Sequence, residues 1–269
     1  MPSSLGVARS AAPEWEDGLP LLFRDYTFQQ YVVGPGNSYA FEAAKLTSTR
    51  HGTSGLSIFP NCLFLHGKPG LGKTHLMVAA ARAIELEHPE CLIRYRSAGD
   101  FQRELFASML RKDAAYLRKA YRYVDVLLLD DMELLGPSGG HAGQQFHAFL
   151  NSLLHDGKTV LLSSASPLHQ RTGLQDGPAS WFGWGLVAEI LPLDRDGRVH
   201  LIRNKLAEME GRNLPSISEG GIQFLAEQDI CDMRELKGLL NRILFQSERT
   251  MGLLSFEEVH ALIATSLSS

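Results

Sequence analysis

One glycine-rich segment of the sequence has the spacing of a phosphate-binding loop. In such a loop, backbone N–H groups surround phosphate oxygens, and the following helix directs its N-terminal dipole at the same anion. The lysine reaches the β- and γ-phosphates, and the threonine hydroxyl binds Mg²⁺. The alternative is an accidental match in a glycine-rich turn. The residues that fit the pattern G-x-x-x-x-G-K-[ST] are Gly67, Lys68, Pro69, Gly70, Leu71, Gly72, Lys73 and Thr74. His75, the next residue, is also expected at the nucleotide.

Two consecutive carboxylates follow an apolar run about 55–60 residues after this loop. Asp130 and Asp131 come directly after Val124–Leu129. In P-loop nucleotidases, an Asp at the end of a strand helps to hold Mg²⁺. We therefore predict that Asp130 binds the metal through water, and that Asp131 orients or deprotonates the attacking water. Without the phosphate-binding loop, the two aspartates would be better explained as a solvated junction between a strand and a loop.

Short apolar runs alternate with helical patterns around these residues. Alternating strands and helices predict βαβ units and a central parallel sheet, so the predicted class is α/β. Asn37 or Ser38 is placed to cap the first helix. The predicted strands are 62–66, 91–96, 124–129, 159–163 and 186–191, and the predicted helices are 38–46, 75–86, 98–110, 113–121 and 144–154.

The pattern changes after Pro192, where helices follow without a strand between them. We predict helices over 195–210, 218–227, 233–247 and 256–266. The predicted organisation is a tail over 1–23, a nucleotide-binding α/β domain over 24–192 and a small helical domain over 193–269.

Composition excludes several classes of protein. The 269 residues carry a formal net charge of −4, which argues against broad nucleic-acid binding driven by salt release. Cys62, Cys91 and Cys231 stand far apart, so a disulfide framework or a zinc finger is not expected. No apolar run approaches the roughly 18 residues of a membrane span. We expect a cytoplasmic protein that associates with the nucleoid only through partners.

Several strings together resemble the ATP-binding core of the DnaA family of bacterial replication initiators. The resemblance covers roughly residues 24–268. The strings are Tyr26-Thr27-Phe28, Tyr31–Ser38, the phosphate loop, Tyr123–Asp131, Gln145–Asn151, Phe182–Leu186 and Met233–Gly238.

The resemblance implies a P-loop AAA+ three-layer sandwich followed by an all-α lid. It implies ATP or ADP with Mg²⁺ as ligands, and a linker over 32–37 that lies near the adenine. Val33, Gly34 and Asn37 are the linker residues expected at the nucleotide. Arg234 resembles the lid arginine called sensor 2, which touches the γ-phosphate. A surface arginine on a helix is the alternative.

The sequence departs from the family pattern where hydrolysis is promoted. Ala165 replaces the polar sensor 1 residue, and Trp181 stands where the family carries its arginine finger. Gly177 stands where a second arginine is common, and the insertion over 136–141 holds no Lys or Arg. The sequence ends where initiators continue into a helix-turn-helix domain, so we expect no autonomous sequence-specific binding of duplex DNA.

Two functions fit this pattern. One is a DnaA-family protein of initiation or its regulation, which associates with the initiator in an ATP-dependent manner and is at most a weak Mg²⁺-dependent ATPase. The other is a non-hydrolysing, ATP-bound adaptor or cap. A helicase loader or a transposition ATPase is a weaker third reading. The expected partners are the initiator or a second copy.

Two weaker signals concern partners. Leu19–Phe23 resembles the sliding-clamp peptide of the regulatory relative Hda, although packing of a linker on the domain explains it better. We interpret a basic cluster as a solvated helix face, and binding of an acidic partner or of a DNA backbone is the less favoured alternative. Its members are Arg111, Lys112, Arg118, Lys119 and Arg122.

Overall fold

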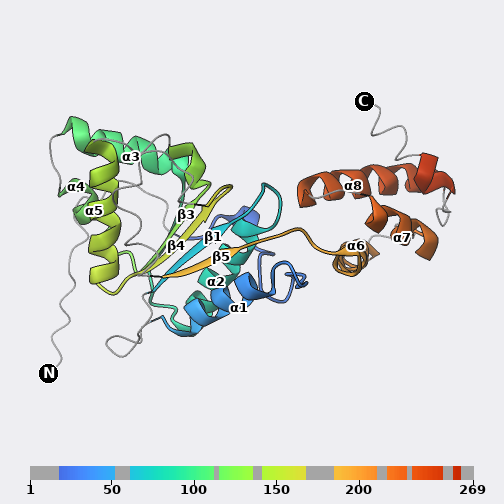
Figure 1. Ribbon diagram of the computed structural model, residues 1–269, viewed down its shortest axis with the longest axis horizontal. Coiled ribbons are helices and arrows are strands. Elements are labelled where there is room, and N and C mark those ends of the chain that lie inside the picture. The colour runs from blue at the N-terminus through green and yellow to red at the C-terminus, as the bar shows by residue number, and fades with distance from the viewer. Residues whose placement is uncertain are drawn as a thin grey trace, which may run out of the picture.

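The core of the molecule is a five-stranded parallel sheet (Figure 1). The computed structural model describes residues 18–51, 61–111, 115–135, 141–167, 185–210, 217–228, 232–250 and 257–261. The strands are β1 (Cys62–His66), β2 (Ile93–Ser97), β3 (Val126–Asp130), β4 (Thr159–Ser164) and β5 (Leu186–Glu189). Their order is β2-β3-β4-β1-β5, so β1 lies between β4 and β5 and delivers the loop that follows it to the carboxyl edge of the sheet.

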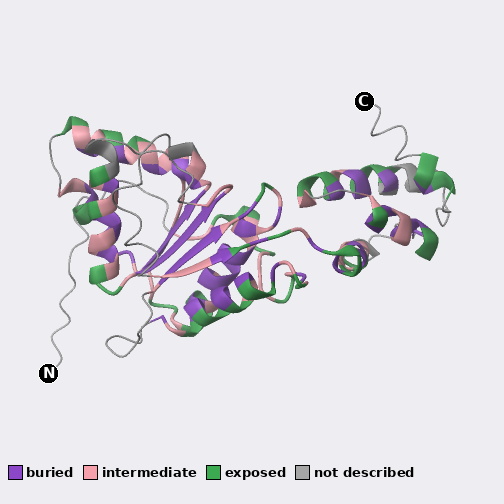
Figure 2. Ribbon diagram, in the orientation of Figure 1, coloured by how far each residue is buried: buried purple, intermediate pink, exposed green. Residues whose placement is uncertain are grey.

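Helices cover both faces of the sheet, which explains why the strands are apolar on both sides. The helices α1 (Ser38–Thr49) and α2 (Lys73–Glu87) pack on one face. The opposite face is covered by α3 (Ala98–Leu110), α4 (Tyr116–Ala120) and α5 (His141–His155). Figure 2 shows the strands buried between these two layers. The predicted α/β class and the three-layer arrangement are therefore confirmed.

A separate group of helices follows β5. It consists of α6 (Arg195–Glu210), α7 (Glu219–Glu227) and α8 (Met233–Thr250), with a further helical segment over 257–261. These helices enclose a core of their own, centred on Ile202, Leu225 and Ile243. Figure 1 shows this group to one side of the sheet, joined to it by the segment after β5. The separate core supports the predicted division near residue 192, which stays a prediction.

Most predicted elements lie within a few residues of the observed ones. The predicted strand 91–96 is shifted, because β2 pairs with β3 only from Ile93, while the N–H of Leu92 donates to the Asp125 carboxylate (2.9 Å). Two short 3₁₀ helices, Leu21–Phe23 and Met132–Leu135, had no signal in the sequence. Ser97 caps α3 by accepting a hydrogen bond from the N–H of Asp100 (3.2 Å).

Several predictions fall outside the described residues. They concern the tail before residue 18, Lys112 in the basic cluster, residues 136–140 of the insertion, Gly177, the string from Trp181 to Trp184, and Cys231. Among the described residues, no helix is long and apolar enough to cross a membrane.

Candidate functional site

The glycine-rich loop after β1 has a backbone that only glycines adopt easily. Gly70 and Gly72 have φ angles of 77° and 91°, in the left-handed region. A Cβ atom on Gly70 would lie 1.9 Å from the Asp232 carboxylate, and one on Gly72 would lie 3.1 Å from the Tyr31 ring. The φ angles therefore favour glycine at both positions, and the neighbouring side chains leave little room for a Cβ. The loop ends at the first residue of α2, as the sequence predicted.

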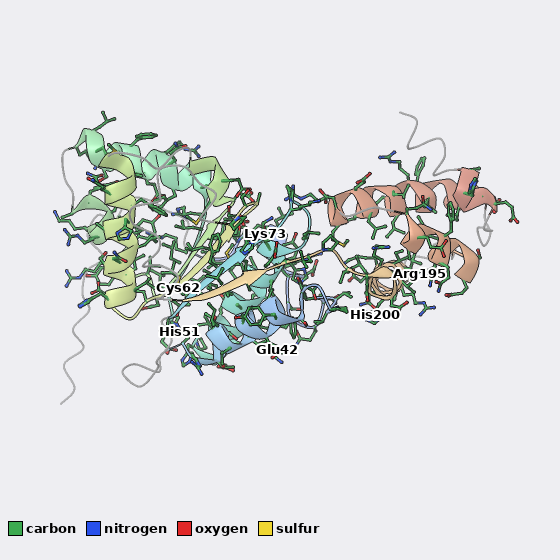
Figure 3. All side chains as sticks on the ribbon, in the orientation of Figure 1. Glu42, His51, Cys62, Lys73, Arg195 and His200 are labelled. Atoms are coloured by element: carbon green, nitrogen blue, oxygen red, sulfur yellow. The ribbon has the colours of Figure 1, made fainter. Side chains whose placement is uncertain are left out.

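Lys73 begins α2 and is buried, with 6% of its surface exposed. Its Nζ donates to the carbonyl oxygens of Gly67 (2.7 Å) and Lys68 (3.0 Å). Burial lowers the pKa of Lys73, and the carboxylates of Glu133, Asp131 and Asp130 raise it. Figure 3 labels Lys73 at the end of the sheet away from Cys62 and His51. This cation is held beside the loop backbone, where the phosphates of a nucleotide would need it.

The Asp130 carboxylate at the end of β3 is the centre of a hydroxyl cluster. It is 2% exposed and accepts hydrogen bonds from Thr74 Oγ1 (2.7 Å), Tyr95 Oη (2.9 Å) and Ser163 Oγ. The bond from Thr74 joins the phosphate loop to the acidic pair, as a shared metal site requires. Tyr95 and Ser163 are functional candidates that the sequence did not indicate. They come from β2 and β4, the strands next to β3.

Tyr95→Phe should reduce stability, because the buried carboxylate then loses one donor. Burial and Asp130 raise the pKa of Tyr95, so its hydroxyl remains a donor at neutral pH. Hydrogen bonds to charged groups contribute about 1.5–3 kcal/mol, and we expect a loss of that size in the free energy of unfolding. Urea denaturation measures it. Tyr123→Phe, at a residue 69% exposed, is the matched control and should change little. Equal effects of both changes would contradict the prediction.

Asp131 adopts a strained backbone next to the pocket. Its φ is 57°, which is unusual for a residue other than glycine, and its N–H donates to Ser163 Oγ (3.1 Å). Burial, Asp130 and Glu133 raise the pKa of the Asp131 carboxyl, whereas Lys73 and Arg234 lower it. Asp131 and Glu133 both line the pocket beside the loop.

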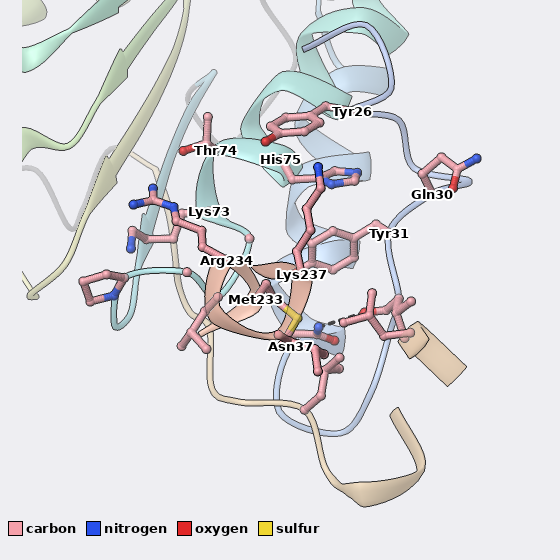
Figure 4. Close-up of a pocket in the computed structure, with 18 of the residues that line it drawn as sticks. Tyr26, Gln30, Tyr31, Asn37, Lys73, Thr74, His75, Met233, Arg234 and Lys237 are labelled. Carbon is pink, nitrogen blue, oxygen red and sulfur yellow. Dashed lines mark hydrogen bonds between the residues drawn. The ribbon is translucent and has the colours of Figure 1, made fainter. Parts of the chain in front are cut away.

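A pocket of about 440 Å³ lies between the glycine-rich loop and the helical group. The two parts meet where the N–H of Met233, the first residue of α8, donates to the Gly70 carbonyl (3.2 Å). Arg234 follows and lines the pocket, and its guanidinium lies beside Lys73 in Figure 4. Pro69 and Leu71 of the loop line the same pocket, together with Gly70, Gly72, Lys73, Thr74 and His75.

The linker before α1 forms the other wall of the pocket. Of its predicted site residues, Asn37 lines the pocket, whereas Val33 and Gly34 do not belong to the lining. Asn37 precedes α1, but its side chain does not cap the helix. Its Oδ1 accepts from the N–H of Gly34 (2.8 Å), and its Nδ2 donates to the carbonyl of Val32 (3.0 Å). Asn37 therefore shapes the linker turn, and Val32 is the linker valine at the pocket.

Aromatic residues of the N-terminal segment complete this wall. The His75 ring stacks on Tyr26 with centroids 4.7 Å apart, and His75 Nε2 lies 2.9 Å from the Thr27 carbonyl. Because a carbonyl only accepts, His75 Nε2 carries the proton. Burial lowers the pKa of His75, which keeps the ring neutral at neutral pH. Tyr26 and Tyr31 were noted in the sequence only as part of a family string, not as pocket residues.

The fold and the site define a P-loop nucleotide-binding protein of the AAA+ class. Residues 22–189 match the family described as the bacterial DnaA ATPase domain. The chain therefore belongs to the bacterial DnaA ATPase domain family. Its resemblance to this family, inferred from the sequence, is confirmed.

The similarity to individual members extends beyond the sheet. The chain is 36% identical over 218 residues to the chromosomal replication initiator protein DnaA of Lactiplantibacillus plantarum, covering 81% of this chain and 46% of that protein. It is similar to domain III of Thermotoga maritima DnaA, with a TM-score of 0.76, 31% identity, and coverage of 90% and 97% of the two chains. For AMPPCP-bound DnaA of Aquifex aeolicus, the TM-score is 0.68, the identity 29%, and the coverage 83% and 66%. The chain spans about half the length of the curated relatives that it matches.

Proposed function

We propose that this chain is an ATP-binding module of the DnaA type that acts in the initiation of bacterial chromosomal replication or in its regulation. The observation that carries the proposal is the convergence of three elements on one pocket. The first turn of α2 supplies Lys73 and Thr74, the segment after β3 supplies Asp131, and α8 supplies Arg234. Thr74 Oγ1 also donates a hydrogen bond to the buried Asp130 carboxylate. The AMPPCP-bound relative supports a nucleoside triphosphate as the ligand.

Each of these residues has a distinct role in the proposal. Lys73 exchanges its bonds with the loop carbonyls for contacts with the β- and γ-phosphates, and Arg234 neutralises the γ-phosphate. Thr74 Oγ1 and the Asp130 carboxylate are hard oxygen ligands that fit Mg²⁺, directly or through water. A bound Mg²⁺ would supply charge neutralisation between the phosphates. Asp131 borders the same pocket and is the proposed base or orienting group for water.

The proposal includes slow hydrolysis. Ala165 offers only its backbone N–H at the position of sensor 1, and this N–H donates to the Glu133 carboxylate (2.9 Å). The methyl side chain of Ala165 is too short to contact a γ-phosphate and cannot hydrogen-bond to it. Trp181 has no cation to place at the phosphate of a neighbouring subunit. We therefore propose a long-lived ATP-bound form that associates with the initiator or with a second copy.

A pull-down with the host initiator, with and without ATP, tests this association. Retention of the initiator only with ATP, and its loss in Lys73→Ala, is the expected result. Equal retention in both conditions would contradict an ATP-dependent association.

The N-terminal segment gives limited support to a contact with the sliding clamp. Leu21 and Leu22 are 89% and 82% exposed, as a docking peptide requires. Leu19 and Phe23, in contrast, pack against the core, and the Phe23 ring lies 5.1 Å from both Tyr26 and Tyr95. A clamp that takes the whole of Leu19–Phe23 would have to release Phe23 from the domain. Packing on the domain therefore remains the better explanation of this segment.

We predict no sequence-specific binding of duplex DNA by these 269 residues. Their net charge is −4, and the insertion over 136–141 carries no Lys or Arg to contact a phosphate backbone. Fluorescence anisotropy with an origin fragment and a scrambled fragment at physiological salt measures this. The expected affinities are weak and equal. A preference of about 10³-fold or more for the origin, as specific binders show, would refute the prediction.

A further inference from the structure

The hydroxyl of Tyr31 is a buried polar group without a partner. Within the described residues, Tyr31 Oη makes no hydrogen bond and is shielded from solvent. Its ring is held from two sides, by Phe41 with centroids 5.9 Å apart and by His75 with centroids 5.3 Å apart. Buried polar groups are nearly always hydrogen-bonded, so this exception needs an explanation.

Packing alone does not explain the hydroxyl. A phenylalanine would make the same ring contacts without the free-energy cost of burying an unpaired O–H. The Asn37 side chain is close enough to lower the pKa of the Tyr31 phenol, but its Oδ1 and Nδ2 already bond to Gly34 N and Val32 O. Tyr31 therefore has a donor and an acceptor available for a group that enters the pocket.

Tyr31 lies in the part of the pocket that is suited to a flat ring. Figure 4 shows Tyr31 and Asn37 on the linker side, facing Met233 and Lys237 of α8. A Cβ on Gly72 would lie 3.7 Å from Tyr31 Oη, so the hydroxyl borders the loop just before α2. Apolar residues of the pocket lining include Val32, Leu191, Leu193, Leu201, Met233 and Leu240, and the lining also holds Lys205 and Lys237.

We propose that Tyr31 Oη hydrogen-bonds the heterocyclic base of the bound nucleotide and thereby contributes to its selection. The apolar walls favour an uncharged ring over a phosphate, and the phosphates have their cations at Lys73 and Arg234. One hydroxyl in such surroundings favours ligands that hydrogen-bond to it over ligands that do not, because the latter leave the O–H unsatisfied. The proposal rests on nucleotide binding at this site.

The test replaces Tyr31 by phenylalanine and compares three probes by calorimetry. ATP should bind about tenfold more weakly to Tyr31→Phe, the effect of one hydrogen bond. Ribose 5-triphosphate and inorganic tripolyphosphate, which lack the base, should bind both proteins equally. The unfolding midpoint of the ligand-free protein should stay the same or rise, because an unpaired buried group is removed. Tyr39→Phe, at a residue 62% exposed on α1, is the matched control.

The outcomes separate this proposal from the one on which it rests. Unchanged ATP affinity in Tyr31→Phe would overturn the role of the hydroxyl and leave nucleotide binding intact. An equal loss for ribose 5-triphosphate or tripolyphosphate would also overturn it, because the contact would then not be to the base. Failure of the unaltered chain to bind ATP would overturn both proposals.

Discussion

Lys73→Ala should remove most of the affinity for ATP and ADP. Lys73 is buried against the loop, and its carbonyl partners belong to Gly67 and Lys68, so it is positioned for phosphates. Truncating one partner of a buried charged pair costs about 2–5 kcal/mol. At 1.4 kcal/mol per tenfold change, this corresponds to about 30-fold to 4,000-fold in the dissociation constant. Calorimetry in Mg²⁺ buffer measures the loss.

Lys68→Ala is the matched control for this measurement. Lys68 belongs to the same loop, but unlike Lys73 it is exposed to solvent. Its removal should change the affinity by less than tenfold, because screened surface charges contribute about 0–1 kcal/mol. Equal affinity of Lys73→Ala and the unaltered protein would show that the pocket does not hold phosphates as assigned.

Hydrolysis of bound ATP should not accelerate as the chain is concentrated. Arginine fingers contribute about 10³–10⁵ in kcat, or about 4–7 kcal/mol of transition-state stabilisation. By the resemblance to the family pattern, Trp181 stands at the sequence position of the finger, and a tryptophan side chain carries no cation. Single-turnover hydrolysis at rising protein concentration should therefore remain at its basal rate. An initiator subunit that presents its own arginine to this site should raise the rate.

Trp181→Arg provides the complementary variant. If copies of the chain associate so that the residue at position 181 of one copy reaches the nucleotide of another, the rate should then depend on protein concentration. A fast rate in the unaltered chain that rises with its own concentration would contradict the account and favour an ordinary ATPase. No acceleration by an initiator that demonstrably binds the chain would favour a purely structural module.

The fold and the phosphate end of the site follow from local patterns. The apolar run before Asp130 and the glycine spacing around Lys73 each depend on neighbours in the sequence, so both could be predicted. The alternation of strands and helices then places both at the same edge of a parallel sheet. The bond between Thr74 and Asp130, which are 56 residues apart, confirms that placement.

The rest of the site depends on contacts that no local pattern encodes. Tyr95 and Ser163 reach Asp130 across 35 and 33 residues of sequence, and both resemble ordinary strand residues until the strand order is known. Asn37 shows the opposite error, in which a local pattern predicted a contact that the structure does not form. Its position predicted a helix cap, but the amide bonds to the linker turn because both Gly34 N and Val32 O lie within reach.

A crystal structure of the chain with AMPPCP and Mg²⁺ tests the central claim most directly. We expect the β- and γ-phosphates within hydrogen-bond distance of Lys73 Nζ, the metal beside Thr74 Oγ1 and Asp130, and the Arg234 guanidinium at the γ-phosphate. We also expect the base between the linker and α8, with Tyr31 Oη bonded to it. An analogue bound elsewhere, or bound here with Lys73 still bonded to the carbonyls of Gly67 and Lys68, would contradict it.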